Sequence, residues 1–205
     1  MADDAKVSQF QNPRGLGGRF AGWTMTWWNA GINAFVSEIV DAGPRDHILE
    51  IGFGPGTLLR RLSRNTEQGF IAGVDPSAAM QAQARRRNRH AIERGRMELK
   101  SSDIQRIPYP DARFDKVCTV NTIYFWSDPQ AAAREVFRVT RGGGRFVLAF
   151  RAEEQTPQSF SARRGLHGYA PERARELLEA AGFTDLRMEI RPVRLMTAAC
   201  VIATR

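Results

Sequence analysis

A glycine-rich turn is the part of this sequence whose residues most plainly indicate a binding site. Gly52, Gly54 and Gly56 stand at alternate positions directly after the apolar run 47–51. Glycine lets a ligand lie against bare backbone, because it has no Cβ. Asp75 ends the next apolar run, and a carboxylate at the tip of that strand suits the hydroxyls of a ribose. The two features together predict a site for a nucleoside-bearing cofactor.

Further polar residues follow the later apolar runs. In an open α/β sheet, ligands bind beyond the carboxyl ends of the strands, so residues that follow different strands gather there. Asp103 and Ile104 follow a run near 96–100, and Asn121 follows a run near 114–120. Asp103 can accept a hydrogen bond from a purine amine, and Ile104 can cover the face of a base. These residues indicate an adenosine-bearing molecule.

The spacing of the glycines argues against two common nucleotide sites. The dinucleotide pattern G-x-G-x-x-G needs glycine at position 57, which is Thr57. No lysine follows the turn, which disfavours a nucleoside triphosphate. The acidic Glu50, just before the first glycine, fits a cationic amino acid better than a pyrophosphate.

The elements that must position these residues alternate along the chain. A helix is expected over 22–42, where apolar residues recur at three- and four-residue spacing before Gly43-Pro44 ends it. Strands are expected near 47–51, 70–75, 96–100, 114–120 and 144–150, and helices near 56–65, 77–92, 128–140 and 171–181. Strands separated by helices imply a parallel sheet. Two last runs, 186–190 and 195–203, have no room for a crossover helix, so they should form an antiparallel hairpin at the sheet edge.

This pattern predicts an α/β fold. The expected sheet is Rossmann-like, doubly wound, seven-stranded and mostly parallel, with an antiparallel C-terminal edge hairpin and helices on both faces. The chain has 205 residues, which suits a single domain. Within it we expect an N-terminal irregular segment and cap helix (1–44), a cofactor-binding core (45–150), and a C-terminal helix with edge strands (151–205).

Composition narrows the class of protein. No signal-peptide pattern and no apolar run of about 18 residues is found, so a cytoplasmic protein without a membrane span is expected. Cys118 and Cys200 lie in expected strands and should be reduced core residues, with no metal site. The net charge of +8 comes almost wholly from arginine. The densest run, 85–89, falls in an expected helix and is interpreted as a solvated face.

The motifs taken together resemble the class I S-adenosylmethionine-dependent methyltransferases of the small-molecule type. The resemblance covers residues 45–150 and, more loosely, the C-terminus. Its matching segments are 48–56, 73–77 with Met80, 102–104, 107–111 with 114–117, 135–139 before the triple glycine 142–144, and 177–183. Each segment is weak alone, but their order and spacing are specific.

The resemblance implies roles for the residues singled out above. Glu50 and the glycine turn (Gly52, Gly54, Gly56) would face the methionine part of S-adenosylmethionine, and Asp75 would bind the ribose. Pro76 and Met80 would lie near the adenine, whose amine Asp103 would bind, with Ile104 against the base. The backbone of Asn121 would lie near the amino group and the sulfonium. The product would be S-adenosylhomocysteine.

The methyl acceptor is the part of the reaction that the sequence leaves open. The candidates for the acceptor side are aromatic residues and one histidine: Trp23, Trp27, Trp28, Tyr124, Phe125, Trp126, His167 and Tyr169. Tyr124 is the first choice beside the transferred methyl group, and His167 is the candidate base. A small organic acceptor is favoured, because the Asn-Pro-Pro-Tyr type of tetrapeptide of DNA amino methyltransferases is missing.

Two alternatives remain open. The first is a phospholipid head-group N-methyltransferase that makes peripheral contact with an anionic membrane through its basic surface and aromatic N-terminal helix. The second is a protein that binds S-adenosylmethionine without catalysis. Nucleic acid is not expected as a partner, and the sequence does not give the oligomeric state.

Overall fold

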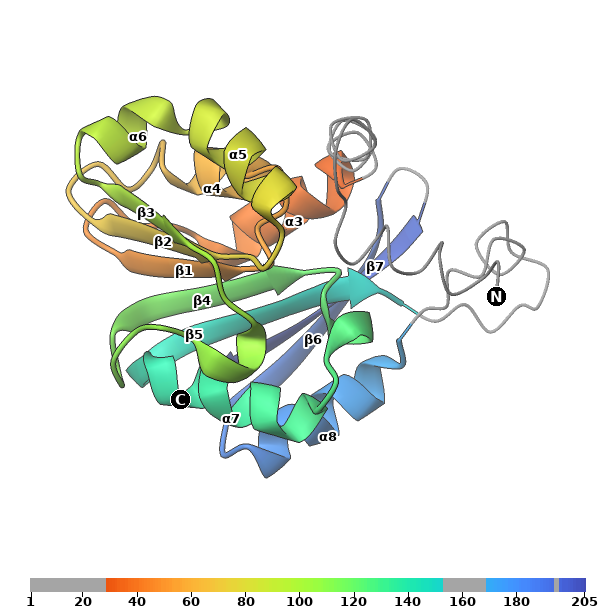
Figure 1. The fold of residues 1–205 in the computed structure, drawn as a ribbon. Coiled ribbons are helices and arrows are strands. Elements are labelled where there is room, and N and C mark those ends of the chain that lie inside the picture. The colour runs from red at the N-terminus through yellow and green to blue at the C-terminus, as the bar shows by residue number, and fades with distance from the viewer. Residues whose placement is uncertain (1–28, 153–168, 194–195) are drawn as a thin grey trace, which may run out of the picture.

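A seven-stranded sheet forms the centre of the molecule in a computed structural model that describes residues 29–152, 169–193 and 196–205 (Figure 1). The strand order is β3-β2-β1-β4-β5-β7-β6. The first five strands pair in parallel, and β7 pairs antiparallel with both β5 and β6. The strands are β1 His47–Ile51, β2 Phe70–Val74, β3 Met97–Lys100, β4 Phe114–Val120, β5 Thr140–Arg151, β6 Thr184–Val193 and β7 Met196–Thr204.

The direction of winding reverses between β1 and β4. The chain runs outward from β1 to β3 and then returns to place β4 on the other side of β1. In folds of this kind the reversal opens a crevice beyond the carboxyl ends of the two strands, where ligands bind.

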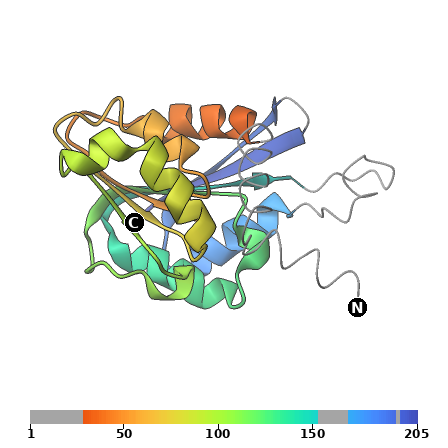
Figure 2. The ribbon, with the colours of Figure 1, turned by 45° about the horizontal axis from the view of Figure 1, so that its top comes forward.

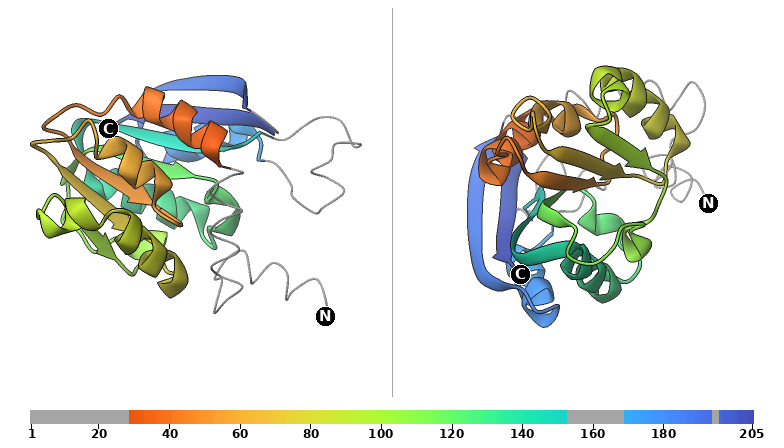
Figure 3. Two further views of the ribbon diagram at one scale, coloured as in Figure 1. Left: turned by 90° about the horizontal axis from the view of Figure 1, so that it is seen from above. Right: turned by 90° about the vertical axis from the view of Figure 1, so that its left-hand side faces the viewer.

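Helices cover both faces of the sheet (Figure 2). On one face lie α3 Ala30–Val40, α4 Thr57–Leu62, α5 Ala78–Arg87 and α6 Arg89–Glu93, and on the other lie α7 Pro129–Val139 and α8 Pro171–Ala180. Two short 3₁₀ helices, η1 Ile104–Arg106 and η2 Ile123–Phe125, follow β3 and β4. Each face has its own apolar core. Figure 3 shows α3 lying across the central strands, where it packs on β4 and β5.

The local signals explain most element boundaries. Strand β5 is apolar on both faces, and residues 146–150 are all buried, as a central strand between two helical layers requires. Helix α8 begins with Pro171 in its first turn. The predicted fold class, including the antiparallel edge hairpin, is confirmed.

Some predicted boundaries were wrong. The single helix expected over 77–92 is two helices, separated at the buried Asn88. The triple glycine does not precede β5 but lies within its bounds, where the pairing register with β4 shifts. Only 30–40 of the helix expected over 22–42 is described as helical, and 22–28 lies outside the described residues.

Cys118 and Cys200 are buried and free, in β4 and β7. Among the helices of the described residues, none has the length and apolar character needed to cross a membrane.

Candidate functional site

A cavity opens at the switch point between β1 and β4, beyond the carboxyl ends of β1, β2 and β4. It is bounded by the glycine turn after β1, the start of the segment after β2, the segment after β3 and the tip of β4. Its lining includes Asn29, Asn33, Glu50, Gly52, Phe53, Gly54, Asp75, Pro76, Met80, Ser102, Asp103, Ile104, Asn121, Thr122, Phe125 and Trp126. Residues from five separate parts of the chain, within 29–33, 50–57, 74–80, 102–104 and 120–126, therefore meet in one place.

The glycine turn brings bare backbone to the floor of this cavity. Gly52 has a φ of 69°, and its N–H donates to the carbonyl of Val74 at 2.8 Å. A Cβ at this position would lie 2.4 Å from Cγ2 of Thr122, at the tip of β4. Only glycine leaves room here for the side chain of Thr122, so the turn after β1 and the segment after β4 can lie in close contact.

The carboxylate of Asp75 holds the turn from the neighbouring strand. Its Oδ2 accepts from the N–H of Gly54 at 2.8 Å, and its Oδ1 accepts from the N–H of Ser77 at 2.8 Å. Burial raises the pKa of Asp75, while the bonds from Ser77 and Gly54 oppose that rise. Each oxygen uses one of its lone pairs, so both can still accept a hydrogen bond from a ligand hydroxyl.

The helix that follows β2 does not depend on Asp75 for its cap. The N-cap of α5 is Ser77, whose hydroxyl accepts from the N–H of Met80 at 3.4 Å. The buried position of Asp75, at 6% exposure, is therefore better explained by its bond to the glycine turn than by helix capping.

Glu50 is a buried carboxyl group in the cavity wall, and one of its oxygens lacks a hydrogen-bond partner among the described residues. The side chain is 3% exposed, and its Oε2 has no hydrogen-bond partner among the described residues. Burial raises its pKa well above the usual value, and the nearby charge of Asp75 raises it further, whereas the N–H of Leu59 lowers it. A buried acidic oxygen without a partner costs free energy. A cationic ligand group in the cavity would supply the missing partner.

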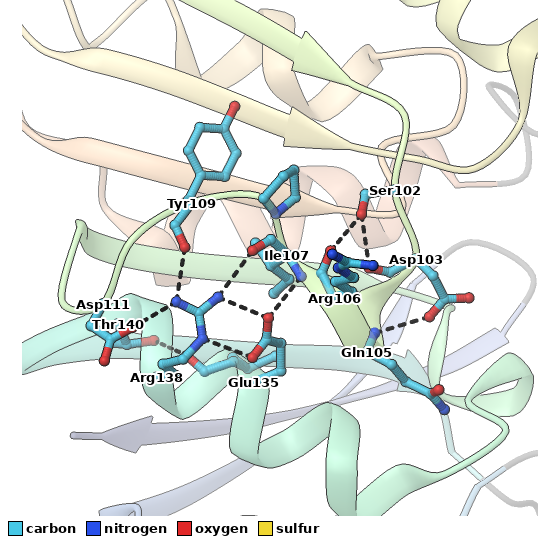
Figure 4. Close-up of polar contacts among 12 residues, drawn as sticks. Ser102, Asp103, Gln105, Arg106, Ile107, Tyr109, Asp111, Glu135, Arg138 and Thr140 are labelled. Carbon is cyan, nitrogen blue, oxygen red and sulfur yellow. Dashed lines mark hydrogen bonds and ion pairs between the residues drawn. The ribbon is translucent and has the colours of Figure 1, made fainter.

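The segment after β3 forms a further part of the cavity wall. Asp103 precedes η1, and its Oδ1 accepts from the N–H of Gln105 at 2.9 Å (Figure 4). The hydroxyl of Ser102 donates to the carbonyl of Arg106 at 2.5 Å. Asp103 is exposed toward the cavity mouth, whereas Ile104 is buried. The segment thus presents a carboxylate and an apolar side chain side by side.

Arg138 of α7 binds the segment that follows β3 and holds it in place. Its guanidinium donates to the carbonyls of Ile107 and Tyr109 at 2.9 and 2.8 Å, and it binds both oxygens of Glu135 at 2.8 Å (Figure 4). Glu135 in turn accepts from the N–H of Ile107 at 2.8 Å. The bond from Arg138 lowers the pKa of Glu135, and burial opposes it. The pair ties the irregular segment after β3 to α7.

Replacing Arg138 by methionine should lower the free energy of unfolding by about 2–4 kcal/mol, because Glu135 and two carbonyls lose their partner together. Urea unfolding at pH 7.5 measures the loss. Arg175→Met is the matched control: Arg175 pairs with Glu179 on the exposed surface of α8 and should cost less than about 1 kcal/mol. Equal losses would contradict the role given to Arg138.

The pH dependence of the free energy of unfolding provides a second test of the pair formed by Arg138 and Glu135. Because the pKa of folded Glu135 is lowered, the stability it contributes is present above its ordinary pKa of 4.5 and is lost as pH falls through the folded value. In the Glu135→Gln variant the free energy of unfolding should therefore fall less steeply as the pH is lowered.

Asn121 connects three separate segments at the edge of the cavity, beyond the tip of β4. It has a left-handed φ of 56° at the tip of β4. Its Nδ2 donates to Oδ1 of Asn29 at 3.1 Å, and its Oδ1 accepts from the N–H of Arg151 at 3.1 Å. The hydroxyl of Tyr124 binds both backbone groups of Arg151, at 2.7 and 3.1 Å. This set, called here the Asn121 latch, joins the start of α3 to the end of β5.

Most residues predicted for the cofactor lie together in the cavity. Those in its lining are Glu50, Gly52, Gly54, Asp75, Pro76, Met80, Asp103, Ile104 and Asn121. Gly56 is not in the lining but lies just beneath it, as the N-cap of α4. The predicted candidates Trp23, Trp27, Trp28 and His167 fall outside the described residues.

Tyr124 does not line the cavity, and its contacts do not support the predicted place beside a transferred group. Its hydroxyl is held by Arg151, and burial raises its pKa to about 12. The turn of η2 instead places Phe125 and Trp126 in the lining.

Asn29 and Asn33 also line the cavity, although they were not predicted to. Two asparagines four residues apart at the start of an apolar helix were the signal that could have identified them.

Comparisons with known proteins agree with this geometry. Residues 49–148 match the family described as "Methyltransferase domain". An uncharacterized methyltransferase of Bacillus subtilis, YdaC, is 24% identical over 192 residues, covering 90% of this chain and 97% of that protein. The O-methyltransferase resE of Aspergillus sclerotiorum is 27% identical over 72% of this chain, which spans 60% of that relative. A crystal structure of a SAM-dependent methyltransferase from Aquifex aeolicus has a TM-score of 0.72 at 17% identity, with 98% of each chain covered.

Proposed function

The chain belongs to the class I S-adenosylmethionine-dependent methyltransferases, and from this we propose that the switch-point cavity binds S-adenosylmethionine and offers its methyl group to a small organic acceptor. The observation that carries the proposal is the unpartnered Oε2 of Glu50, buried in the same wall as Asp75. In this proposal Glu50 would be the acidic group for a cationic amino acid, and Asp75 the carboxylate for a ribose.

The remaining lining residues fit the rest of such a ligand. Asp75 would accept from the ribose hydroxyls while keeping its bonds to the turn. Asp103 would accept from the adenine amine, with Ile104 and Met80 against the base and Pro76 beside it. The backbone at Asn121 would lie near the amino group. The ligand when bound would supply an activated methyl group on a sulfonium.

The acceptor side would be formed by Asn29, Asn33, Phe125 and Trp126. Amide groups can orient a polar acceptor, and the two aromatic rings can exclude water around it. Tyr124 does not act as a base in this proposal, because its hydroxyl is bonded to Arg151 and its pKa is raised. Catalysis then rests on alignment of the two substrates, which can lower a barrier by several kcal/mol. The similarity to O-methyltransferase resE supports an oxygen nucleophile.

Calorimetry with S-adenosylmethionine and S-adenosylhomocysteine tests the first half of the proposal. Binding of both at micromolar concentrations is expected, and no binding of either would refute it. A screen of metabolite extracts for transfer of a labelled methyl group tests the second half. Binding without transfer to any extract would favour a protein that holds the cofactor without catalysis.

Glu50→Gln should change stability and ligand binding in opposite directions: the fold becomes more stable, and the ligand binds more weakly. The neutral amide replaces a buried carboxylate. Because the pKa of this carboxylate is raised in the folded protein, the wild-type side chain destabilises the fold at pH values above its ordinary pKa of 4.5. The variant should therefore melt higher at pH 8, by roughly 2–4 °C for a gain of about 1 kcal/mol. This advantage should shrink as pH falls toward 4.5, because the wild-type side chain then takes up a proton.

The same variant should bind S-adenosylmethionine about tenfold or more weakly, since it loses a charge opposite the ligand's cationic end. Thermal unfolding and calorimetry on one preparation measure both effects. A variant that is less stable and binds normally would contradict the role of Glu50.

A further inference from the structure

A second concave surface lies between α4 and the α5–α6 pair. Four arginines line it: Arg60, Arg64, Arg87 and Arg96. Glu67 is the acidic side chain in the lining. None of the four guanidinium groups forms an ion pair with a carboxylate of residues 29–152, 169–193 or 196–205. We call this surface the arginine groove.

Arg87 shows that this surface is more than a solvated helix face, as the run 85–89 was interpreted from the sequence. The side chain is half-buried, and its Nη1 donates to the carbonyl of Pro55 at 2.5 Å and to the hydroxyl of Thr57 at 3.0 Å. Burial lowers its pKa, and the positive charge of Arg60 lowers it further. Two like charges thus face one concave surface, and an anion there would relieve their repulsion.

Asn88 adds a second and independent indication. It is 4% exposed, and its Nδ2 donates to the carbonyls of Gly56 and Ala84 at 3.1 and 3.0 Å. Its Oδ1, however, has no partner among the described residues, although Asn88 lines the groove. A buried acceptor without a donor costs free energy. The groove therefore has cationic donors at its surface and, among the described residues, a buried acceptor without a partner in its wall.

We propose that the arginine groove is a second binding site, which takes free hydrogen phosphate or a phosphomonoester in its singly protonated, monoanionic form. The guanidinium groups of Arg60, Arg64 and Arg87 would bind the phosphate oxygens, and Oδ1 of Asn88 would accept from the phosphate hydroxyl. Arg87 can do so through Nε and Nη2, because Nη1 makes both of its bonds to the turn. A phosphodiester has no such hydroxyl, so a nucleic-acid backbone fits less well.

Inorganic phosphate at constant ionic strength is the direct probe, with sulfate as its matched anion. Sulfate has the charge of hydrogen phosphate but no proton to give to Asn88. Calorimetry should show phosphate binding more tightly than sulfate, and phosphate should raise the melting temperature in the absence of S-adenosylmethionine. Equal affinity for the two anions would overturn the proposal, because charge alone would then explain binding.

The variant Arg60→Gln/Arg64→Gln should weaken phosphate binding by about tenfold or more, while its melting temperature without phosphate stays close to that of the wild type. The control is Arg86→Gln, an exposed arginine of α5 outside the groove lining, which should change the affinity less than about twofold. Equal loss in both variants would overturn the proposal in favour of non-specific attraction. Glycerol phosphate and a short DNA duplex distinguish the sources, and preferential binding of the duplex would also overturn it.

Discussion

Asp75→Ala is expected to weaken the binding of S-adenosylhomocysteine by about 100-fold or more. The carboxylate is proposed to bind the ribose and also holds the N–H groups of Gly54 and Ser77. Hydrogen bonds to a charged group contribute about 1.5–3 kcal/mol each, so losing two or more of them gives an effect of this size. Calorimetry against the wild type measures it.

The control for this variant is Asp128→Ala. Asp128 is the N-cap of α7 and accepts from the N–H of Ala131 at 2.9 Å. Its loss should cost about 1 kcal/mol of stability and leave the affinity unchanged. If Asp75→Ala behaved in the same way, losing stability but not affinity, Asp75 would be a structural residue and the site assignment would be wrong.

Gly56→Ala is expected to destabilise the fold by about 3–5 kcal/mol, the range of severe core substitutions. Gly56 has a φ of 75°, and a Cβ there would lie 2.7 Å from both the Cβ of Ala84 and the Nδ2 of Asn88. The backbone of α5, at 3.0 Å, leaves no room to move aside. Equilibrium unfolding in urea measures the loss.

Gly95→Ala isolates the conformational part of this cost. Gly95 has a similar φ of 68°, but nothing lies within 4 Å of a Cβ built on it. Its substitution should cost about 1–2 kcal/mol, the penalty of a left-handed conformation alone. The difference between the two variants then measures how closely α5 packs on the glycine turn. Equal losses would show that this packing contributes nothing.

The sequence predicted the strands well because their signals are local. The apolar run 47–51 matches β1 residue for residue, and the short link between the last two runs was enough to predict their antiparallel pairing. The order of β1, β2 and β4 also brought Glu50, Asp75 and Asn121 into one cavity, as expected.

Features that depend on tertiary contacts were not predictable in this way. Residues 78–87 are good helix formers, and a single asparagine would not by itself end the helix, but it breaks where the amide of Asn88 binds the carbonyl of Gly56. Tyr124 follows β4 as predicted, yet its direction is set by the backbone of Arg151, which is 27 positions away in the sequence. The bond between Asp75 and Gly54 has no local signal either.

The Asn121 latch has a consequence for the motions of the cavity edge that it closes. The N–H of Arg151 is bonded to two side chains, those of Asn121 and Tyr124, rather than to a neighbouring strand. Its exchange with deuterium therefore requires only that these side chains separate, whereas the amides of the central part of β5 exchange through larger openings of the sheet. The Arg151 amide is thus a reporter of how often the start of α3, the tip of β4 and the end of β5 come apart. A ligand that fills the cavity should slow its exchange while leaving the centre of the sheet unchanged.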